Sequence, residues 1–413
     1  MKFSQYNFLP AIQKSLETLG FNRPTDIQFK AIPSIAKGED VMAVAATGTG
    51  KTAAYAIPII QKLATSNRRY KGIRALVLAP TRELAVQIHG VFESIGKETD
   101  LLMVALVGGV EQDNQIRQLG EEADVVVATP GRIFDLMAQG HLNLDGVETL
   151  VLDESDRMMA LGFMKDVLDI KKRLPYRHQT LFFSATINES IKKQAYSLVH
   201  NAIRIQVSPK NSVSKNVEHT VAMIGMDDKR FFLEDIIRKH PDARMVVFVR
   251  TQVRAERVQK AMLRVGLDVA TLHGGMEQQD RFSALESFTS GQKNVLVTTD
   301  VSARGMDIKN VVYVINYDMP DLPENYIHRL GRTGRGMQKG FAMSFCSGEE
   351  KPLLQEIEQY LGDVIHITPI EKDDYKATID LGGETGADKK KILALIKENE
   401  ALNKSAKSGK KKK

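Results

Sequence analysis

Short apolar runs of three to five residues recur along the chain, separated by stretches with a helical pattern. In the first half these runs are residues 41–44, 75–78, 125–127, 150–152 and 181–183. They show little polar alternation, which is typical of strands buried on both faces of a parallel sheet. Between the runs, apolar residues recur at helical spacing, as at Leu84, Ile88, Val91 and Phe92. This alternation predicts a doubly wound α/β domain.

The pattern pauses near the middle of the chain and then resumes. Residues 208–216 are polar and lack apolar periodicity, so we interpret them as part of a linker. Beyond them lie strand-like runs at residues 245–249, 269–272, 295–297, 311–315 and 341–345. We therefore predict two α/β domains of similar layout. Their expected limits are 1–207 for the first domain, 208–217 for the linker, 218–370 for the second domain and 371–413 for a C-terminal extension with a Lys-rich tail.

Composition narrows the class of protein. A length of 413 residues with 43% apolar and 26% charged residues suits two folded domains and excludes a fibrous or disordered chain. The single cysteine, Cys346, excludes a disulfide framework and a zinc site built from cysteine pairs. The first residues lack the apolar segment of a signal peptide, and the longest apolar run, 101–110, is far shorter than the ~20 residues that span a bilayer. We expect a cytoplasmic protein without a membrane partner.

Positive charge is concentrated at one end of the chain. The formal net charge is +6, whereas residues 388–413 contain ten Lys, one Asp and two Glu, so the rest of the chain is nearly neutral. We expect residues 410–413 to be disordered, and residues 392–396 could form a short amphipathic helix. Two interpretations of this tail stay open. Either it binds nucleic-acid phosphate nonspecifically, so that its deletion weakens binding and flattens the salt dependence, or it only solubilises the chain.

A glycine-rich segment follows the first predicted strand and precedes a helical run. It differs from the phosphate-binding pattern G-x-x-x-x-G-K-[ST] at one position, where Ala45 replaces the first glycine. Gly48 and Gly50 allow successive N–H groups to point into one concavity, to which the following helix adds its N-terminal dipole. Lys51 can reach the β- and γ-phosphates, and the Thr52 hydroxyl can bind Mg²⁺. The predicted phosphate-binding residues are Ala45, Ala46, Thr47, Gly48, Thr49, Gly50, Lys51 and Thr52.

Acidic residues at the end of another predicted strand complete the pattern of a nucleotide-hydrolysing site. Asp153 follows the run 150–152, where its carboxylate could hold Mg²⁺ through water. Glu154 could then orient and deprotonate an attacking water. Acidic residues after a strand are often helix N-caps instead. Their pairing with the phosphate loop favours the catalytic interpretation.

Residues 153–156 read Asp-Glu-Ser-Asp and differ from Asp-Glu-Ala-Asp only at Ser155. Here the chain resembles the DEAD-box ATP-dependent RNA helicases, of the bacterial type with a short basic tail. The resemblance covers about residues 3–346, with similar motifs in order at 20–28, 80–85, 108–109, 129–132, 184–186, 248–250, 278–281, 299–307 and 328–335. It implies two tandem RecA-like domains that use ATP and Mg²⁺. Because Asp153, Glu154 and Asp156 remain, we expect hydrolysis to persist despite Ser155.

The resemblance also assigns roles around the nucleotide. Phe21, Arg23 and Gln28 fall in the adenine-reading Q motif, and Phe3 is the isolated aromatic residue that precedes it. The Gln28 carboxamide both donates and accepts, which suits adenine N6 and N7 and predicts a preference for ATP over GTP. Arg332 and Arg335 resemble arginine fingers that stabilise charge on the γ-phosphoryl group. The remaining candidates are Asp307 as a nucleotide contact, and Ser184, Thr186 and His328 as groups that couple ATP state to RNA.

By the same resemblance, RNA lies along both domains and is held through its sugars and phosphates. Such contacts carry no sequence information, so we expect little sequence preference, with the 2′-OH separating RNA from DNA. The family's known roles suggest ribosomal precursors or RNA-decay machinery as partners, and we expect a monomer. The candidate RNA-binding residues are Arg82, Gly109, Thr129 and Arg132 in the first domain and Arg250, Arg281 and Thr299 in the second.

Three activities compete at this point. The first is an RNA-dependent ATPase that closes its domains on RNA and unwinds short duplexes. The second is a DNA-acting helicase on the same two domains, which the Q motif and the motifs at 299–307 and 328–335 disfavour. The third is an ATP-gated RNA clamp, which need not retain Glu154, Arg332 and Arg335. We therefore favour the helicase.

Overall fold

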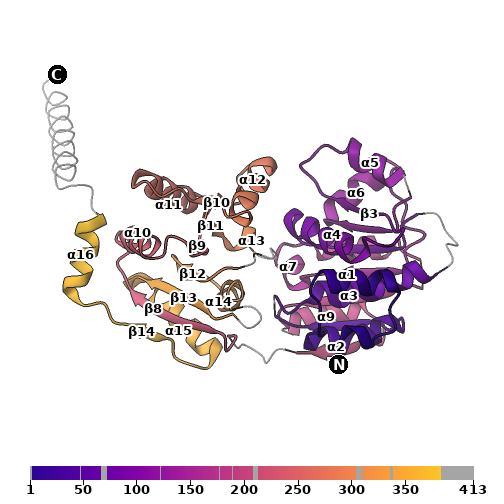
Figure 1. Ribbon diagram of the computed structural model, residues 1–413, viewed down its shortest axis with the longest axis horizontal. Coiled ribbons are helices and arrows are strands. Elements are labelled where there is room, and N and C mark those ends of the chain that lie inside the picture. Colours follow the sequence, from indigo (N-terminus) through magenta and orange to yellow (C-terminus); the bar gives the residue numbers. More distant parts are fainter. Residues whose placement is uncertain are drawn as a thin grey trace, which may run out of the picture.

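The computed structural model describes residues 2–46, 48–66, 72–120, 122–175, 177–187, 189–207, 213–303, 308, 310–334 and 338–382. Within them the chain forms two lobes side by side, each built on a seven-stranded parallel sheet (Figure 1). We refer to these lobes as the first and second domains. The predicted α/β class is confirmed for both.

The first sheet has the strand order β3-β4-β2-β5-β6-β1-β7. Strands β1 and β5 therefore flank β6, and because all strands run parallel, the segments that follow them meet at one edge. The phosphate loop follows β1 and the acidic residues follow β5, so the sheet itself brings them together. The strands are β1 (Val41–Val44), β2 (Ala75–Leu78), β3 (Met103–Leu106), β4 (Val125–Ala128), β5 (Thr149–Leu152), β6 (Gln179–Ser184) and β7 (Ile203–Gln206).

Helices cover both faces of this sheet. Successive residues of β1 point to opposite faces, so Val41 and Ala43 join one buried cluster while Met42 joins the other. This double burial explains why the strands lack polar alternation. The helices are η1 (Phe3–Gln5), α1 (Pro10–Thr18), α2 (Asp26–Ala36), α3 (Lys51–Thr65), α4 (Arg82–Gly96), α5 (Asp113–Gly120), α6 (Pro130–Ala138), α7 (Ser155–Ala160), α8 (Met164–Lys171) and α9 (Glu189–Leu198).

The second sheet has the order β10-β11-β9-β12-β13-β8-β14. Its strands are β8 (Val217–Met223), β9 (Met245–Val249), β10 (Ala270–Leu272), β11 (Val295–Thr299), β12 (Tyr313–Asn316), β13 (Gly340–Cys346) and β14 (His366–Thr368). Helix α16 lies on the side of this domain away from the first domain (Figure 1). The helices are α10 (Lys229–Lys239), α11 (Gln252–Arg264), α12 (Gln278–Thr289), α13 (Asp300–Ala303), α14 (Pro323–Leu330), η2 (Gly348–Glu350), α15 (Lys351–Leu361) and α16 (Lys372–Gly382).

Each predicted strand is present, whereas β3, β7, β8 and β14 were not predicted as strands. Strand β7 lies at the edge of its sheet and contains the exposed Ile203 and Arg204, so it lacks a continuous apolar run. Strand β8 begins at Val217, the last residue of the expected linker, while residues 208–212 lie outside the described part of the chain. The exact domain limits stay a prediction. In the residues that the structure describes, no helix combines the length and apolar character needed to cross a membrane.

Candidate active site

The phosphate loop joins β1 to α3 and has the backbone shape of an anion site. Gly48 and Gly50 have φ angles of 81° and 87°, in the left-handed region that favours glycine. A Cβ at Gly50 would also collide with the Gln28 side chain. Lys51 begins α3, is only 7% exposed, and donates from Nζ to the Ala45 carbonyl oxygen at 2.8 Å. Its ammonium group therefore points back over the loop, where phosphates would lie.

The Asp153 carboxylate is fixed at the end of β5 by two hydrogen bonds. The Tyr55 hydroxyl donates to its Oδ2 and the Glu154 N–H to its Oδ1, both at 2.8 Å. Burial raises the pKa of Asp153, although the positive charge of Lys51 opposes the shift. Burial, and next the negative charge of Asp153, raise the pKa of Tyr55 well above its usual value. Tyr55 is a site residue that the sequence did not reveal, because a tyrosine inside α3 looks like a core residue.

Glu154 occupies a strained position directly after Asp153. Its φ of 48° lies in the left-handed region, which is rare for a residue with a side chain and recurs at functional sites. Burial raises the pKa of Glu154, while the positive charges of Arg157, Lys51 and Arg332 oppose this rise. A buried carboxylate with a raised pKa is suited to accept a proton from water.

Arg332 of the second domain faces this carboxylate. It is 2% exposed, and with Glu154 it lines a cavity of about 210 Å³ between the two domains. The cavity also contains Asp156 and His328. The structure thus brings the predicted base and one predicted arginine finger to the same place, from opposite domains.

Ser155, the one departure from the family tetrad, is fully buried beneath the site. Its Oγ lies 3.1 Å from the carbonyl oxygens of Leu152 and Phe183, at the ends of β5 and β6, and its single hydrogen can be donated to either or shared between them. The extra oxygen is therefore hydrogen-bonded within the sheet and adds no free polar group to the cleft.

The three predicted coupling residues meet around Asp156. Its Oδ2 accepts hydrogen bonds from the Thr186 N–H at 3.1 Å and the Thr186 hydroxyl at 2.9 Å, and Ser184 donates to the Thr186 carbonyl at 2.6 Å. Burial alone would raise the pKa of Asp156, but His328, Lys51 and the Thr186 hydrogen bonds lower it below its usual value. Asp156 thus interacts with groups from both domains.

Gln28 connects the adenine-reading segment to the phosphate loop. Its Oε1 accepts from the Thr25 N–H at 2.9 Å, and its Nε2 donates to the Gly50 carbonyl at 3.1 Å. An amide has a second donor hydrogen and a second lone pair, so both functions stay available to a base. Phe21 packs against the buried Phe3, with ring centroids 6.1 Å apart, and Arg23 is exposed nearby.

Two of the predicted RNA-binding arginines are joined across the domain interface. Arg82 Nη1 donates to Gln278 Oε1 at 2.9 Å, and Gln278 Nε2 donates to Glu83 Oε1 at 3.0 Å. Glu83 Oε1 also pairs with Arg281 Nη2 at 2.8 Å. Glu83 and Gln278, both buried, lie inside motifs quoted above but had no predicted role. A Cβ at Gly109 would collide with the Arg82 guanidinium, so glycine is needed there for close approach.

The other first-domain candidates lie at the start of α6. Thr129 is its N-cap, and Arg132 is 8% exposed. Arg132 Nε donates to Gln115 Oε1 at 3.2 Å, and its Nη1 to Gln112 Oε1 at 3.4 Å. Arg132 Nη2 is buried and has no hydrogen-bond partner among the described residues.

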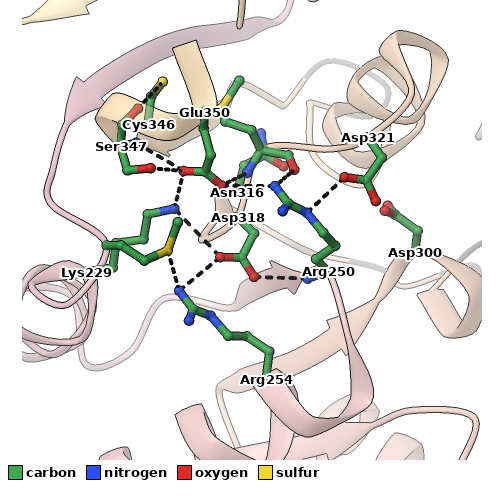
Figure 2. Close-up of polar contacts among 12 residues, drawn as sticks. Lys229, Arg250, Arg254, Asp300, Asn316, Asp318, Asp321, Cys346, Ser347 and Glu350 are labelled. Carbon is green, nitrogen blue, oxygen red and sulfur yellow. Dashed lines mark hydrogen bonds and ion pairs between the residues drawn. The ribbon is translucent and has the colours of Figure 1, made fainter. Parts of the chain in front are cut away.

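The second-domain candidates lie at the matching edge of their own sheet. Thr299 ends β11, and its hydroxyl donates to Ser302 Oγ at 3.4 Å. Arg250 follows β9 and is held by the carboxylates of Asp321 and Glu350 (Figure 2). Three other predicted site residues, Thr47, Asp307 and Arg335, lie outside the described residues, as does the tail from 383 onward.

Comparison with known proteins agrees with this geometry. Residues 25–194 match the family model described as DEAD/DEAH box helicase, and residues 228–337 match the helicase conserved C-terminal domain. The chain is 37% identical over 361 residues to the ATP-dependent RNA helicase DbpA of Bacillus subtilis, covering 87% of this chain and 74% of that protein. This chain belongs to the DEAD-box family of ATP-dependent RNA helicases.

Further relatives support the family and the fold of this DEAD-box helicase. The ATP-dependent RNA helicase RhlB of Pseudomonas syringae is 37% identical, over 87% of this chain and 93% of that protein. Dbp5 of S. cerevisiae, solved with RNA and ADP BeF3, has a TM-score of 0.82 and 31% identity, covering 92% of this chain and 98% of its own. The two sheets are therefore tandem RecA-like domains.

Proposed function

We propose that this DEAD-box helicase hydrolyses ATP at the junction of its domains, with hydrolysis conditional on their closure around RNA. The observation that carries this proposal is that Glu154 and Arg332, which come from different domains, line the same cavity. Lys51 binds the β- and γ-phosphates, and Glu154 orients and deprotonates the attacking water. Arg332, together with Arg335, stabilises the negative charge that develops on the γ-phosphoryl oxygens. Neither domain alone supplies both sets of groups.

We propose Mg²⁺ as the metal of this site, held by Thr52 and Asp153. A hydroxyl and a carboxylate suit this hard cation, which keeps several waters and binds substrate phosphates. Both Asp153 oxygens already accept a hydrogen bond, which favours an indirect contact through water. When bound, Mg²⁺ would neutralise charge on the phosphate oxygens. Adenine would be read by Gln28 beside Phe21 and Arg23, and Asp307 would contact the nucleotide from the second domain.

We further propose that RNA crosses the carboxyl edges of both sheets and is held through its backbone. The bridge from Arg82 through Gln278 and Glu83 to Arg281 forms only when the domains are together, so closure aligns the two halves of the RNA path. Gly109, Thr129, Arg132, Arg250 and Thr299 complete it. Relatives solved with RNA, including Dbp5 and Mss116, support RNA as the partner. Binding of this kind disturbs short duplexes and has little sequence preference.

The proposal extends to the RNA that the protein acts on in the cell. The candidate targets are ribosomal precursors and RNA-decay substrates. We further propose that the protein is a cytoplasmic monomer, with domains close to 1–207 and 218–370. Crosslinking the protein to RNA in cells and sequencing the bound RNA would choose among these targets. If neither class of RNA is enriched among the crosslinked molecules, both candidate targets are wrong.

The decisive experiment compares wild type with Glu154→Gln in ATPase assays with RNA, with DNA and without nucleic acid. We expect RNA to stimulate the wild type and the variant to bind ATP and RNA but turn over at least a hundredfold more slowly. Glu148→Gln, which changes an acid paired with Arg74 outside the cleft, is the matched control and should keep its turnover. Equal stimulation by DNA would indicate the DNA-acting alternative. If the wild type binds ATP and RNA but does not hydrolyse ATP, the protein acts as an ATP-gated RNA clamp.

A further inference from the structure

A network of charged side chains fills the carboxyl edge of the second sheet (Figure 2). At its centre, Lys229 Nζ lies 2.6 Å from Glu350 Oε2 and 3.6 Å from Asp318 Oδ1. The Lys229 side chain is fully buried, and those of Asp318 and Glu350 are 5% and 3% exposed. The Glu350 carboxylate also accepts from the Met319 N–H at 3.1 Å and the Ser347 N–H at 3.0 Å. The charged groups of this centre are therefore buried and paired with one another.

Arg250 extends from this buried centre to the surface, where we placed it on the RNA path. Its backbone N–H donates to Asp318 Oδ2 at 3.0 Å, and its Nη2 pairs with Glu350 Oε1 at 3.2 Å. Its Nε lies 2.9 Å from Asp321 Oδ1. The guanidinium thus has one side held by a buried carboxylate and another held by a carboxylate in solvent.

The two carboxylates differ in how easily they can be replaced. Glu350 is surrounded by donors and cannot leave without uncovering the buried charge of Lys229. The Asp321 side chain is 60% exposed, and such ion pairs contribute little stability. A phosphate offers the same planar guanidinium a comparable pair of oxygen acceptors. Asp321 is therefore the partner that an incoming phosphate would displace.

We propose that Asp321 is an intramolecular competitor that sets the affinity of this helicase for RNA. Its carboxylate occupies the Nε side of Arg250, and a phosphate of the RNA backbone must replace it to bind there. Glu350 meanwhile keeps Arg250 positioned and outward-facing, so the exchange changes one partner and leaves the side chain in place. This inference rests on the proposed RNA contact of Arg250. It assigns a residue in the β12–α14 loop, outside the RNA-binding residues named above.

The test measures binding of a short fluorescent oligouridylate in the presence of a nonhydrolysable ATP analogue and Mg²⁺, by anisotropy. Asp321→Asn should bind RNA about two- to fivefold more tightly, the range that an exposed ion pair supports. In RNA-stimulated ATPase assays, the half-saturating RNA concentration should fall by the same factor. Asp321→Glu, which keeps the charge, should stay close to wild type.

Asp268→Asn is the matched control. It removes one negative charge from the second domain and breaks an exposed ion pair with Lys293 at 2.7 Å, but lies just before β10, at the opposite edge of the sheet. Its affinity should change less than that of Asp321→Asn. Equal gains in both variants would show a general charge effect and overturn the proposal, as would no gain in Asp321→Asn.

A double-mutant cycle separates this proposal from the proposed RNA contact on which it rests. Arg250→Ala should weaken RNA binding, and in that background Asp321→Asn should bring no further gain. If Arg250→Ala leaves affinity unchanged, the RNA contact at Arg250 is wrong. If Arg250→Ala weakens binding but Asp321→Asn strengthens it equally in both backgrounds, competition at Arg250 is wrong. Unchanged thermal unfolding of the Asp321 variants would show that the fold is intact.

Discussion

The two domains have the same strand order, but the residues at corresponding positions have different roles. In chain order within each sheet, the arrangement is third, fourth, second, fifth, sixth, first, seventh in both. Lys51 begins the helix after the first strand of one sheet, and Lys229 begins the helix after the first strand of the other. Asp153 and Asp318 follow the fifth strand in each. The two lysine–aspartate pairs therefore occupy corresponding places.

What surrounds each lysine explains the difference. Lys51 follows a loop in which Gly48 and Gly50 adopt left-handed φ angles, and its Nζ donates to the Ala45 carbonyl oxygen of that loop, so its partner can be a phosphate. Lys229 follows a segment without such a loop and pairs with Glu350, which occupies its ammonium group from within the domain. A single sheet topology thus carries a glycine-containing loop before the lysine of one domain and a structural ion cluster around the lysine of the other.

Replacing each lysine by alanine is the strongest way to test this contrast, and Lys51→Ala should have the larger effect on ATP turnover. Lys51→Ala removes the charge that holds the β- and γ-phosphates, so we expect ATP turnover to fall by a factor of about 10³ or more. Thermal unfolding should change little. ATPase assays and calorimetry on the same preparation would measure both. Turnover equal to wild type would refute the assigned role of Lys51.

Lys229→Ala should show the reverse pattern. It removes the buried cation that Glu350 and Asp318 share, while Arg250 and Arg254 remain paired with them. Breaking a buried ion pair typically costs about 3–5 kcal/mol of unfolding free energy. Chemical denaturation should therefore show an early transition for the second domain. The double variant Lys229→Met with Glu350→Leu removes both charges and should recover much of the loss. A Lys229→Ala protein as stable as wild type would contradict the buried cluster.

Acidification should stop ATP turnover before it destabilises the second domain, because the pKa of Glu154 is raised and that of Glu350 is lowered. Burial raises the pKa of Glu154 above its ordinary value near 4.5, so its basic form and ATP turnover should be lost as the pH falls toward that raised value. Burial also acts on Glu350, but Lys229 and backbone donors outweigh it and lower the pKa of Glu350 below 4.5. Its stabilising contribution is therefore complete above that value and lost only as the pH falls through the lowered pKa. Turnover should thus fail before the second domain unfolds, as a pH profile and circular dichroism would show.

Tyr55→Phe should have the smallest effect of these changes. It removes the hydroxyl that holds Asp153 Oδ2 and leaves the aromatic packing in place. Loss of one hydrogen bond to a charged group costs about 1.5–3 kcal/mol, so the half-saturating Mg²⁺ concentration should rise by at most about 10- to 150-fold. ATPase titrations with Mg²⁺ would measure it. Tyr313→Phe, which removes a hydroxyl far from the cleft, is the control and should be silent.

The sequence predicted what depends on short segments and missed what depends on how strands assemble. Continuous apolar runs located the buried strands, and residues 45–52 located the phosphate loop, because each pattern is local. The cluster of Lys229, Asp318 and Glu350 joins residues 121 apart in the chain, and only the strand order brings them together. The bridge from Glu83 to Gln278 joins residues 195 apart, and it depends on how the two domains lie against each other. Edge strands such as β7 carry polar residues and gave no periodic signal.

The hydrogen bond from Gln28 to the Gly50 carbonyl joins the residue proposed to read the base to the loop proposed to hold the triphosphate. In the proposed function, the same carboxamide would face the base while it supports the backbone one residue before Lys51. A guanine that mispairs with this amide would therefore also disturb the cradle of the reacting phosphates. Discrimination between purines would then show itself mainly as slow cleavage of the wrong nucleotide, beyond any difference in how tightly each is held.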